Sequence, residues 1–132
     1  MPEFPDVEVY REAIAARVVG ATLERIDLRN PFLLRTAVPP LDVLDGRVVR
    51  DVRRLGKRIV FAFGDAYFLV VHLMVAGRFV WLPARALGAK GPKAPARITL
   101  ALLEFTTGTL ALTEAGTKRR ASLHCVHGED AL

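Results

Sequence analysis

The stretch RVVRDVRRLGKRIVFAFGDAYFLVVHL, residues 47–73, contains three segments of strand length with a period-two pattern, and a turn follows each of the first two. The first segment starts at Val48 and ends near Gly56, the second covers residues 58–63, and the third covers residues 67–73. Gly56 and the pair of Gly64 and Asp65 are turn signals. The pattern predicts three successive β-strands, and the composition of the third predicts burial on both faces.

The rest of the chain adds one helix and more short strands. Apolar residues spaced three or four apart, with Pro5 and Asp6 at the start and Gly20 behind, predict a helix over residues 6–18. The same analysis predicts one helical turn at 41–44, a flexible loop at 88–95, and strands over 22–28, 78–82, 97–105, 109–112 and 120–126. Regular short strands after one helix predict a mainly β fold, a sandwich or barrel with the helix at its N-terminal end.

The composition describes one ordered domain. The chain has 132 residues, 52% of them hydrophobic, which excludes a disordered tail. Cys125 is the only cysteine, so the chain has no internal disulfide and no cysteine-rich zinc site. The acidic, proline-punctuated start is unlike a signal peptide, and the longest apolar stretch, residues 66–77, is too short to span a bilayer. We therefore expect a cytoplasmic protein with no membrane partner.

Basic residues are concentrated in two segments. The chain has 19 Lys and Arg against 14 Asp and Glu, a formal charge of +5. Residues 47–58 hold one acid, Asp51, against six basic residues: Arg47, Arg50, Arg53, Arg54, Lys57 and Arg58. A second cluster is Lys118, Arg119 and Arg120. Two interpretations stay open at this point: a groove for an anionic partner, or a solvated strand face.

The common signatures of enzymes and metal sites are absent. His72, His124 and His127 are scattered and are interpreted as structural or surface residues. We expect no metal and no cofactor in this chain.

The N-terminus carries a chemical possibility of its own. Removal of Met1 exposes Pro2, whose secondary α-amine titrates near ~8. At neutral pH a much larger fraction of this amine is unprotonated than of a lysine side chain. Attack of that amine on a sugar C1′ gives an iminium, which is an electron sink. Glu3 stands beside it as an acid.

Four segments resemble one family. MPEFPDVE at the start resembles the MPELPEVE start of the formamidopyrimidine-DNA glycosylase and endonuclease VIII family, and residues 53–57, RRLGK, resemble its RRxGK segment. Residues 72–78, HLMVAGR, resemble its HLGMSGR segment, and residues 117–121, TKRRA, resemble its DPRRF loop. The resemblance implies a two-sheet β-sandwich, or pseudobarrel, capped by helices.

The resemblance also implies an activity. It is that of a bifunctional base-excision enzyme, which removes oxidised bases from damaged double-stranded DNA and cleaves the abasic site by β/δ-elimination. Pro2 matches the nucleophile that forms the Schiff base, Glu3 a proton donor at the deoxyribose, and Lys57 a second proton donor near the lesion and its phosphate. Arg119 matches the arginine that enters the duplex opposite the extruded nucleotide. The implied protein is a monomer in the bacterial cytoplasm, associated with the nucleoid through DNA.

Further DNA contacts follow from the same segments. The resemblance assigns them to Lys118, Arg120, Arg54, His72, Met74 and Val75. The chain departs from the family pattern at three places: the gap-filling Met falls on Val75 with Met74 one place early, the aromatic of the DPRRF loop falls on Ala121, and a DNA-contacting histidine falls on Pro95.

The length suggests a fragment. The family carries a second domain with a helix–two-turn–helix element and usually a zinc finger, so residues 1–132 are interpreted as the N-terminal catalytic domain alone, with weak DNA binding and weak excision. Two alternatives are a non-catalytic DNA-binding module on the same scaffold and a basic β-domain used for protein contacts.

Overall fold

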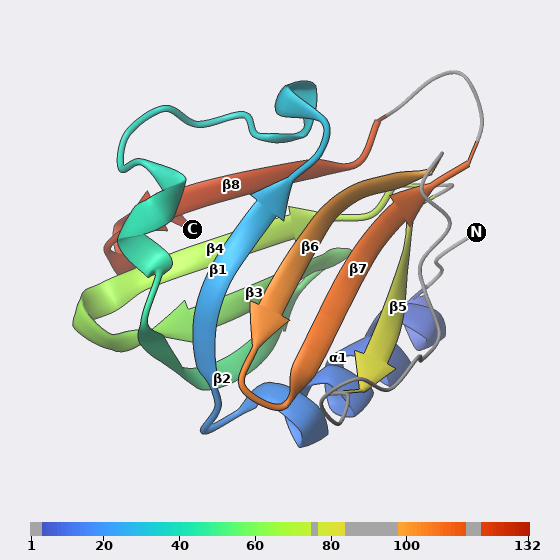
Figure 1. Ribbon diagram of the computed structural model, residues 1–132, viewed down its shortest axis with the longest axis horizontal. Helices are drawn as coiled ribbons and strands as arrows, with labels where there is room; N and C mark the ends of the chain where they lie inside the picture. Colours follow the sequence, from blue (N-terminus) through green and yellow to red (C-terminus); the bar gives the residue numbers. More distant parts are fainter. Residues whose placement is uncertain (1–3, 75–76, 84–97, 116–119) are drawn as a thin grey trace, which may run out of the picture.

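The chain forms eight strands and one long helix in the part that the structure describes. A computed structural model describes residues 4–74, 77–83, 98–115 and 120–132 (Figure 1). The elements in chain order are α1 (Phe4–Val18), β1 (Thr22–Leu28), β2 (Arg47–Leu55), β3 (Arg58–Phe63), β4 (Tyr67–His72), β5 (Gly77–Pro83), β6 (Thr99–Phe105), β7 (Gly108–Glu114) and β8 (Ser122–His127). Short 3₁₀ turns cover η1 (Pro31–Leu33), η2 (Leu41–Leu44), η3 (Gly64–Ala66) and η4 (Glu129–Ala131).

The strands form two layers joined along one edge. Their order is β5-β7-β6-β1-β2-β3-β4-β8, and every pair is antiparallel. The joint between the layers is short, because β1 and β2 pair only at Thr22 with Val48 and at Leu23 with Arg47. The β1-β6-β7-β5 layer lies in front of the β2-β3-β4-β8 layer in Figure 1. The predicted mainly β, two-layer fold with an N-terminal helix is confirmed.

Helix α1 closes one side between the layers. Val7, Ile14 and Val18 are buried, as the predicted spacing requires. The Tyr10 ring meets the ring of Phe79 on β5 edge-on at 5.7 Å, while the Arg11 guanidinium donates to a carbonyl oxygen of β2 at 3.4 Å. The helix therefore contacts both layers. It begins two residues earlier than predicted, and no helix in the described residues has the length and apolar character of a membrane span.

The β3 and β4 strands are buried on both faces, as predicted for residues 67–73. Phe61 and Leu69 belong to the core between the layers. Val60, Ala62, Phe68 and Val70 form a second cluster on the opposite face, which Leu55, Val126 and Leu132 help to cover.

The cover over this outer cluster is held in place by charge. Arg53 lies over the Phe68 ring at 5.5 Å and donates to Glu129 of η4 at 2.9 Å. Both faces of β3 and β4 are therefore apolar because one packs in the core between the layers and the other packs in this outer cluster.

Candidate nucleic-acid interface

One end of the β2-β3-β4-β8 layer brings together residues that are far apart in the chain. Arg58 at the start of β3 pairs with His72 at the end of β4, and His72 pairs with Ser122 at the start of β8. Lys57 lies next to Arg58 in the two-residue turn between β2 and β3, where Gly56 adopts a φ of 62°. This left-handed conformation favours glycine and leaves both Lys57 and Arg58 exposed.

Five basic or imidazole side chains form the centre of this end, and we call them the basic surface: Arg35, Lys57, Arg58, His72 and His124. Burial lowers the pKa of His72, and the charges of Arg58, His124 and Lys57 lower it further. Burial lowers the pKa of His124 as well, with Arg35 and Arg58 adding to the effect. Both imidazoles therefore favour the neutral form at pH 7 and can donate a hydrogen bond without adding charge.

The arginines and the lysine of this region have no carboxylate partners in the described part of the chain. Among those residues Arg35, Lys57, Arg58 and Arg120 take part in no ion pair, and all four are exposed. Their positive charge is therefore available to an external anion such as a phosphate.

The preceding arginines of the basic run have internal roles instead. Arg54 is largely buried and lies 3.3 Å from a Glu8 oxygen of α1. Arg53 pairs with Glu129 at 2.9 Å and with Asp51 at 3.5 Å. The middle of the basic run therefore ties the strand to the helix and to η4, a role that neither interpretation included, whereas Lys57 and Arg58 at its end are exposed.

A turn begins at Met74, shortly after the end of β4. Met74 adopts a φ of 60°, and the Gly77 N–H donates to the Leu73 carbonyl at 3.0 Å. A Cβ added at Gly77 would lie 2.2 Å from that carbonyl oxygen, so the turn requires glycine at this position. Met74 is partly buried at the beginning of the turn.

A buried carboxylate at the end of β7 binds the backbone directly before β8. Glu114 at the end of β7 is 1% exposed, and its carboxylate accepts hydrogen bonds from the backbone N–H groups of Arg120 and Ala121, each at 3.1 Å. These two N–H groups are unavailable to a strand ladder, so β8 begins at Ser122 rather than at residue 120 as predicted. The Arg120 side chain projects from this junction into solvent.

Several residues predicted for the site lie outside the described residues. They are Pro2, Glu3, Val75, Lys118 and Arg119, together with Pro95. Of the others, Lys57 and His72 lie together in the basic surface, whereas Arg54 contacts α1.

Sequence reasoning missed His124 and Arg35 as members of this surface. His124 on β8 pairs with Val70 on β4, and it shares a face with His72, which lies two positions along from Val70. That relation depends on the register between two strands that are far apart in the chain, and no local pattern reports it. Arg35 reaches the same place because its N–H donates to the Leu123 carbonyl at 2.9 Å.

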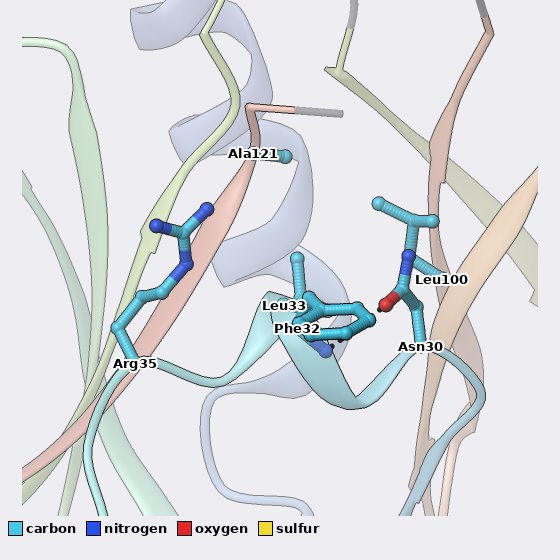
Figure 2. Close-up of a pocket in the computed structure, with 6 residues that line it drawn as sticks. All are labelled: Asn30, Phe32, Leu33, Arg35, Leu100 and Ala121. Atoms are coloured by element: carbon cyan, nitrogen blue, oxygen red, sulfur yellow. Dashed lines mark hydrogen bonds between the residues drawn. The ribbon is translucent and has the colours of Figure 1, made fainter. Parts of the chain in front are cut away.

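A small open pocket borders the basic surface. It is lined by Asn30, Phe32, Leu33, Arg35, Leu100 and Ala121, and Figure 2 shows the Phe32 ring at its mouth between Arg35 and Asn30. Ala121 is 2% exposed and contributes only a methyl group to the pocket wall.

The cysteine and the carboxylates offer no metal site among the described residues. No group of three His, Cys, Asp or Glu side chains there is arranged to hold a metal ion. Burial raises the pKa of the Cys125 thiol to about 11, which keeps it protonated and unreactive at neutral pH.

Comparison with known proteins gives one consistent result. Residues 1–122 match the family described as formamidopyrimidine-DNA glycosylase N-terminal domain. The formamidopyrimidine-DNA glycosylase of Paraburkholderia phymatum is 44% identical over 79 residues, which are 58% of this chain and 28% of that protein. The enzyme of the same name from Heliobacterium modesticaldum is 36% identical over 84 residues, 62% of this chain and 30% of that protein.

A solved structure shares the fold. The Lactococcus lactis FPG (MutM) chain, crystallised with DNA containing FAPY-dG, superimposes with a TM-score of 0.81 at 22% identity, over 98% of this chain and 46% of that chain. The chain therefore spans less than half of the length of the proteins that it matches. The two-layer sheet, the N-terminal helix and the family match over residues 1–122 place the chain in the formamidopyrimidine-DNA glycosylase N-terminal domain family.

Proposed function

We propose that the chain is the catalytic part of a base-excision repair enzyme that removes oxidised bases from double-stranded DNA and then acts as an abasic-site lyase. The observation that carries this proposal is the family match, which includes the N-terminal Pro2 and Glu3 as well as the RRLGK segment that ends at Lys57. The exposed basic surface supports it, because phosphate contacts supply most of the affinity of proteins for DNA.

The proposed reaction begins at the Pro2 nitrogen. Its lone pair forms a bond to C1′ of the damaged nucleotide while the C1′–base bond breaks, and the proton that the Pro2 nitrogen then loses balances the proton that the leaving base takes up. Ring opening of the sugar then gives an iminium between Pro2 and C1′, with Glu3 as the proton donor to the sugar oxygen. The iminium accepts the electron pair that is left when a C2′ proton is removed, and the 3′ phosphate leaves. Lys57 supplies the second proton near that phosphate.

The DNA-binding residues have complementary roles in this proposal. Lys118, Arg120 and His72 hold or orient the phosphate backbone on either side of the lesion, and Arg119 enters the duplex opposite the extruded nucleotide. Met74 and Val75 border the gap that the extruded nucleotide leaves. Extrusion itself costs a few kcal/mol, because the base loses its stacking. The partner is damaged DNA, and the place of action is the bacterial cytoplasm. The chain by itself is expected to be a weak enzyme and a monomer.

The first test is reductive trapping of the covalent intermediate. The purified chain, with loss of Met1 verified by intact mass, is mixed with a duplex that contains an abasic site and is then treated with borohydride. We expect a stable protein–DNA adduct from the wild type and none from Pro2→Gly, because only the secondary amine gives an iminium that needs no protonation. Arg50→Ala, which removes an exposed arginine of β2 before the RRLGK segment, should trap like the wild type.

Two results would refute the assignment. One is a wild-type chain without Met1 that gives no adduct at saturating concentration, and the other is a Pro2→Gly variant that traps equally well.

The second candidate is a DNA-binding module without catalysis. Ala121, which offers a methyl group where a wedge between bases needs a large side chain, favours it. This candidate predicts DNA affinity with a log K slope of roughly −0.9 against log salt per phosphate contacted and no trapped adduct. An affinity that does not change with salt would exclude it.

A further inference from the structure

An aromatic side chain is exposed beside the basic surface without an internal function. Phe32 is 82% exposed, whereas the other phenylalanines with described exposure are at most 8% exposed. An exposed phenylalanine ring gains none of the burial energy that an interior position would supply. The ring therefore contributes little to the folded core and is accessible for an external contact.

The backbone that carries Phe32 is rigidly supported. Asn30 accepts a hydrogen bond from the Phe32 N–H through its side-chain oxygen at 3.0 Å, and Pro31 occupies the first position of η1. Leu33 on the next position is 2% exposed and anchors the turn in the core. The N–H groups of Arg29 and Asn30 donate to the Leu100 carbonyl at 2.8 and 3.0 Å. Because these contacts already order the backbone at Phe32, the backbone loses little conformational entropy when the ring binds a partner.

The surroundings of the ring are positive. Arg35 lines the same pocket as Phe32, and its charge also reaches His124 of the basic surface. The exposed Arg120 directly precedes Ala121, and Ala121 forms the opposite wall of the pocket. Arg35 and Arg120 have no carboxylate partner among the described residues.

An exposed aromatic ring, flanked by arginines that have no carboxylate partner within the described ranges, fits a nucleic acid better than a protein surface. Phosphates bind the arginines, and a base has a flat apolar face for the ring. In an intact duplex the base faces are covered by their neighbours, and a face becomes accessible where a nucleotide is missing or extruded.

We propose that Phe32 stacks on a base that becomes accessible at the damaged position, and that it fills part of the space that the small Ala121 leaves open. The inference rests on the proposed function, because it requires that the basic surface binds DNA. It adds a specific contact from η1, an element outside the four segments that resemble the family.

The test compares two duplexes and three variants of the whole chain. One duplex carries a tetrahydrofuran abasic analogue opposite 2-aminopurine, and the other is the same sequence with a normal nucleotide at the analogue. We expect Phe32→Ala to bind the abasic duplex about tenfold more weakly, because a loss of that size lies within the range of base–aromatic stacking, and to lose less affinity for the intact duplex. Wild-type binding should quench or shift the 2-aminopurine fluorescence, and Phe32→Ala should lose that signal.

Two further variants separate stacking from a structural role. Phe32→Trp keeps a stacking ring and should bind the abasic duplex like the wild type. Val38→Ala removes a side chain that is 86% exposed on the same connection between β1 and β2, and it should leave both affinities unchanged. The thermal midpoint of Phe32→Ala should equal that of the wild type.

The outcomes distinguish this inference from the proposed function. Salt-dependent binding by the wild type with equal binding by Phe32→Ala overturns the stacking role and leaves the proposed function standing. An equal loss on both duplexes overturns the contact with an accessible base. A wild-type chain that binds neither duplex refutes both proposals together.

Discussion

His72 and His124 connect the chemistry of the surface to the stability of the fold. Each is partly buried, and each has a lowered pKa with burial as the main cause. The folded state therefore binds protons on these rings less readily than the unfolded state, whose imidazoles titrate near ~6.5. As the pH falls through that value the unfolded state takes up protons first, and the free energy of unfolding decreases until the folded-state pKa values are passed.

We expect the chain to lose stability between pH 7 and the lowered pKa values of the two histidines. Urea denaturation at several pH values measures this loss, and a His72→Gln, His124→Gln double variant should show a flatter curve over the same window. His127→Gln serves as the control, since this histidine is exposed and lies at the other end of β8. A double variant with the pH dependence of the wild type would contradict the expectation.

At the scale of elements, the strands followed from local patterns and their joints did not. Residues 22–28 and 58–63 were predicted with the bounds that the structure has, because alternation and flanking turn residues are local signals. The start of β8 was predicted two residues early, since the Glu114 carboxylate takes two N–H groups that a sequence pattern assigns to the strand. The meeting of His72 with His124 depends on strand register, which the sequence does not display.

Glu114 joins the end of β7 to the start of β8, and its substitution should change the free energy of unfolding. Glu114→Ala leaves the N–H group of buried Ala121 without its acceptor, and such a loss costs about 1–3 kcal/mol. Glu114→Gln keeps one acceptor oxygen and should cost less. The midpoint of urea unfolding measures both. A Glu114→Ala variant as stable as the wild type would show that water replaces the carboxylate.

At the scale of the whole molecule, the chain has apolar packing on both faces of the β3–β4 pair. Predicting the burial of residues 67–73 from composition was correct, but what covers the outer face could not be predicted. The cover comes from residues near the other end of the sequence, such as Val126 and Leu132, and from the pair of Arg53 and Glu129. The motifs include Lys57 and His72 of the basic surface, whereas Arg35 of that surface and Phe32 in the adjoining pocket belong to no motif.

Phe68 tests whether the outer cluster contributes to stability as an interior does. Phe68 is 3% exposed, so Phe68→Ala should cost about 3–5 kcal/mol, comparable to Phe61→Ala in the core between the layers. Val48→Ala, at a position 42% exposed on β2, should change the free energy of unfolding by no more than about 0.5 kcal/mol. Calorimetry or urea titration gives the comparison. A Phe68→Ala cost similar to that of Val48→Ala would mean that the outer cover contributes little.

The short joint between β1 and β2 determines how the molecule comes apart. In the described residues β1 and β2 are paired in register at two positions only, and a few backbone hydrogen bonds flank this joint, such as that from the Val49 N–H to the Ala21 carbonyl. Much of the remaining attachment is side-chain contact around residues such as Leu23 and Phe61. Separating the layers would expose the shared apolar core to water, so neither layer is expected to stay folded without the other. Amide protons of the central strands in the front and rear layers should therefore exchange with solvent at a common slow rate, through one opening of the entire domain.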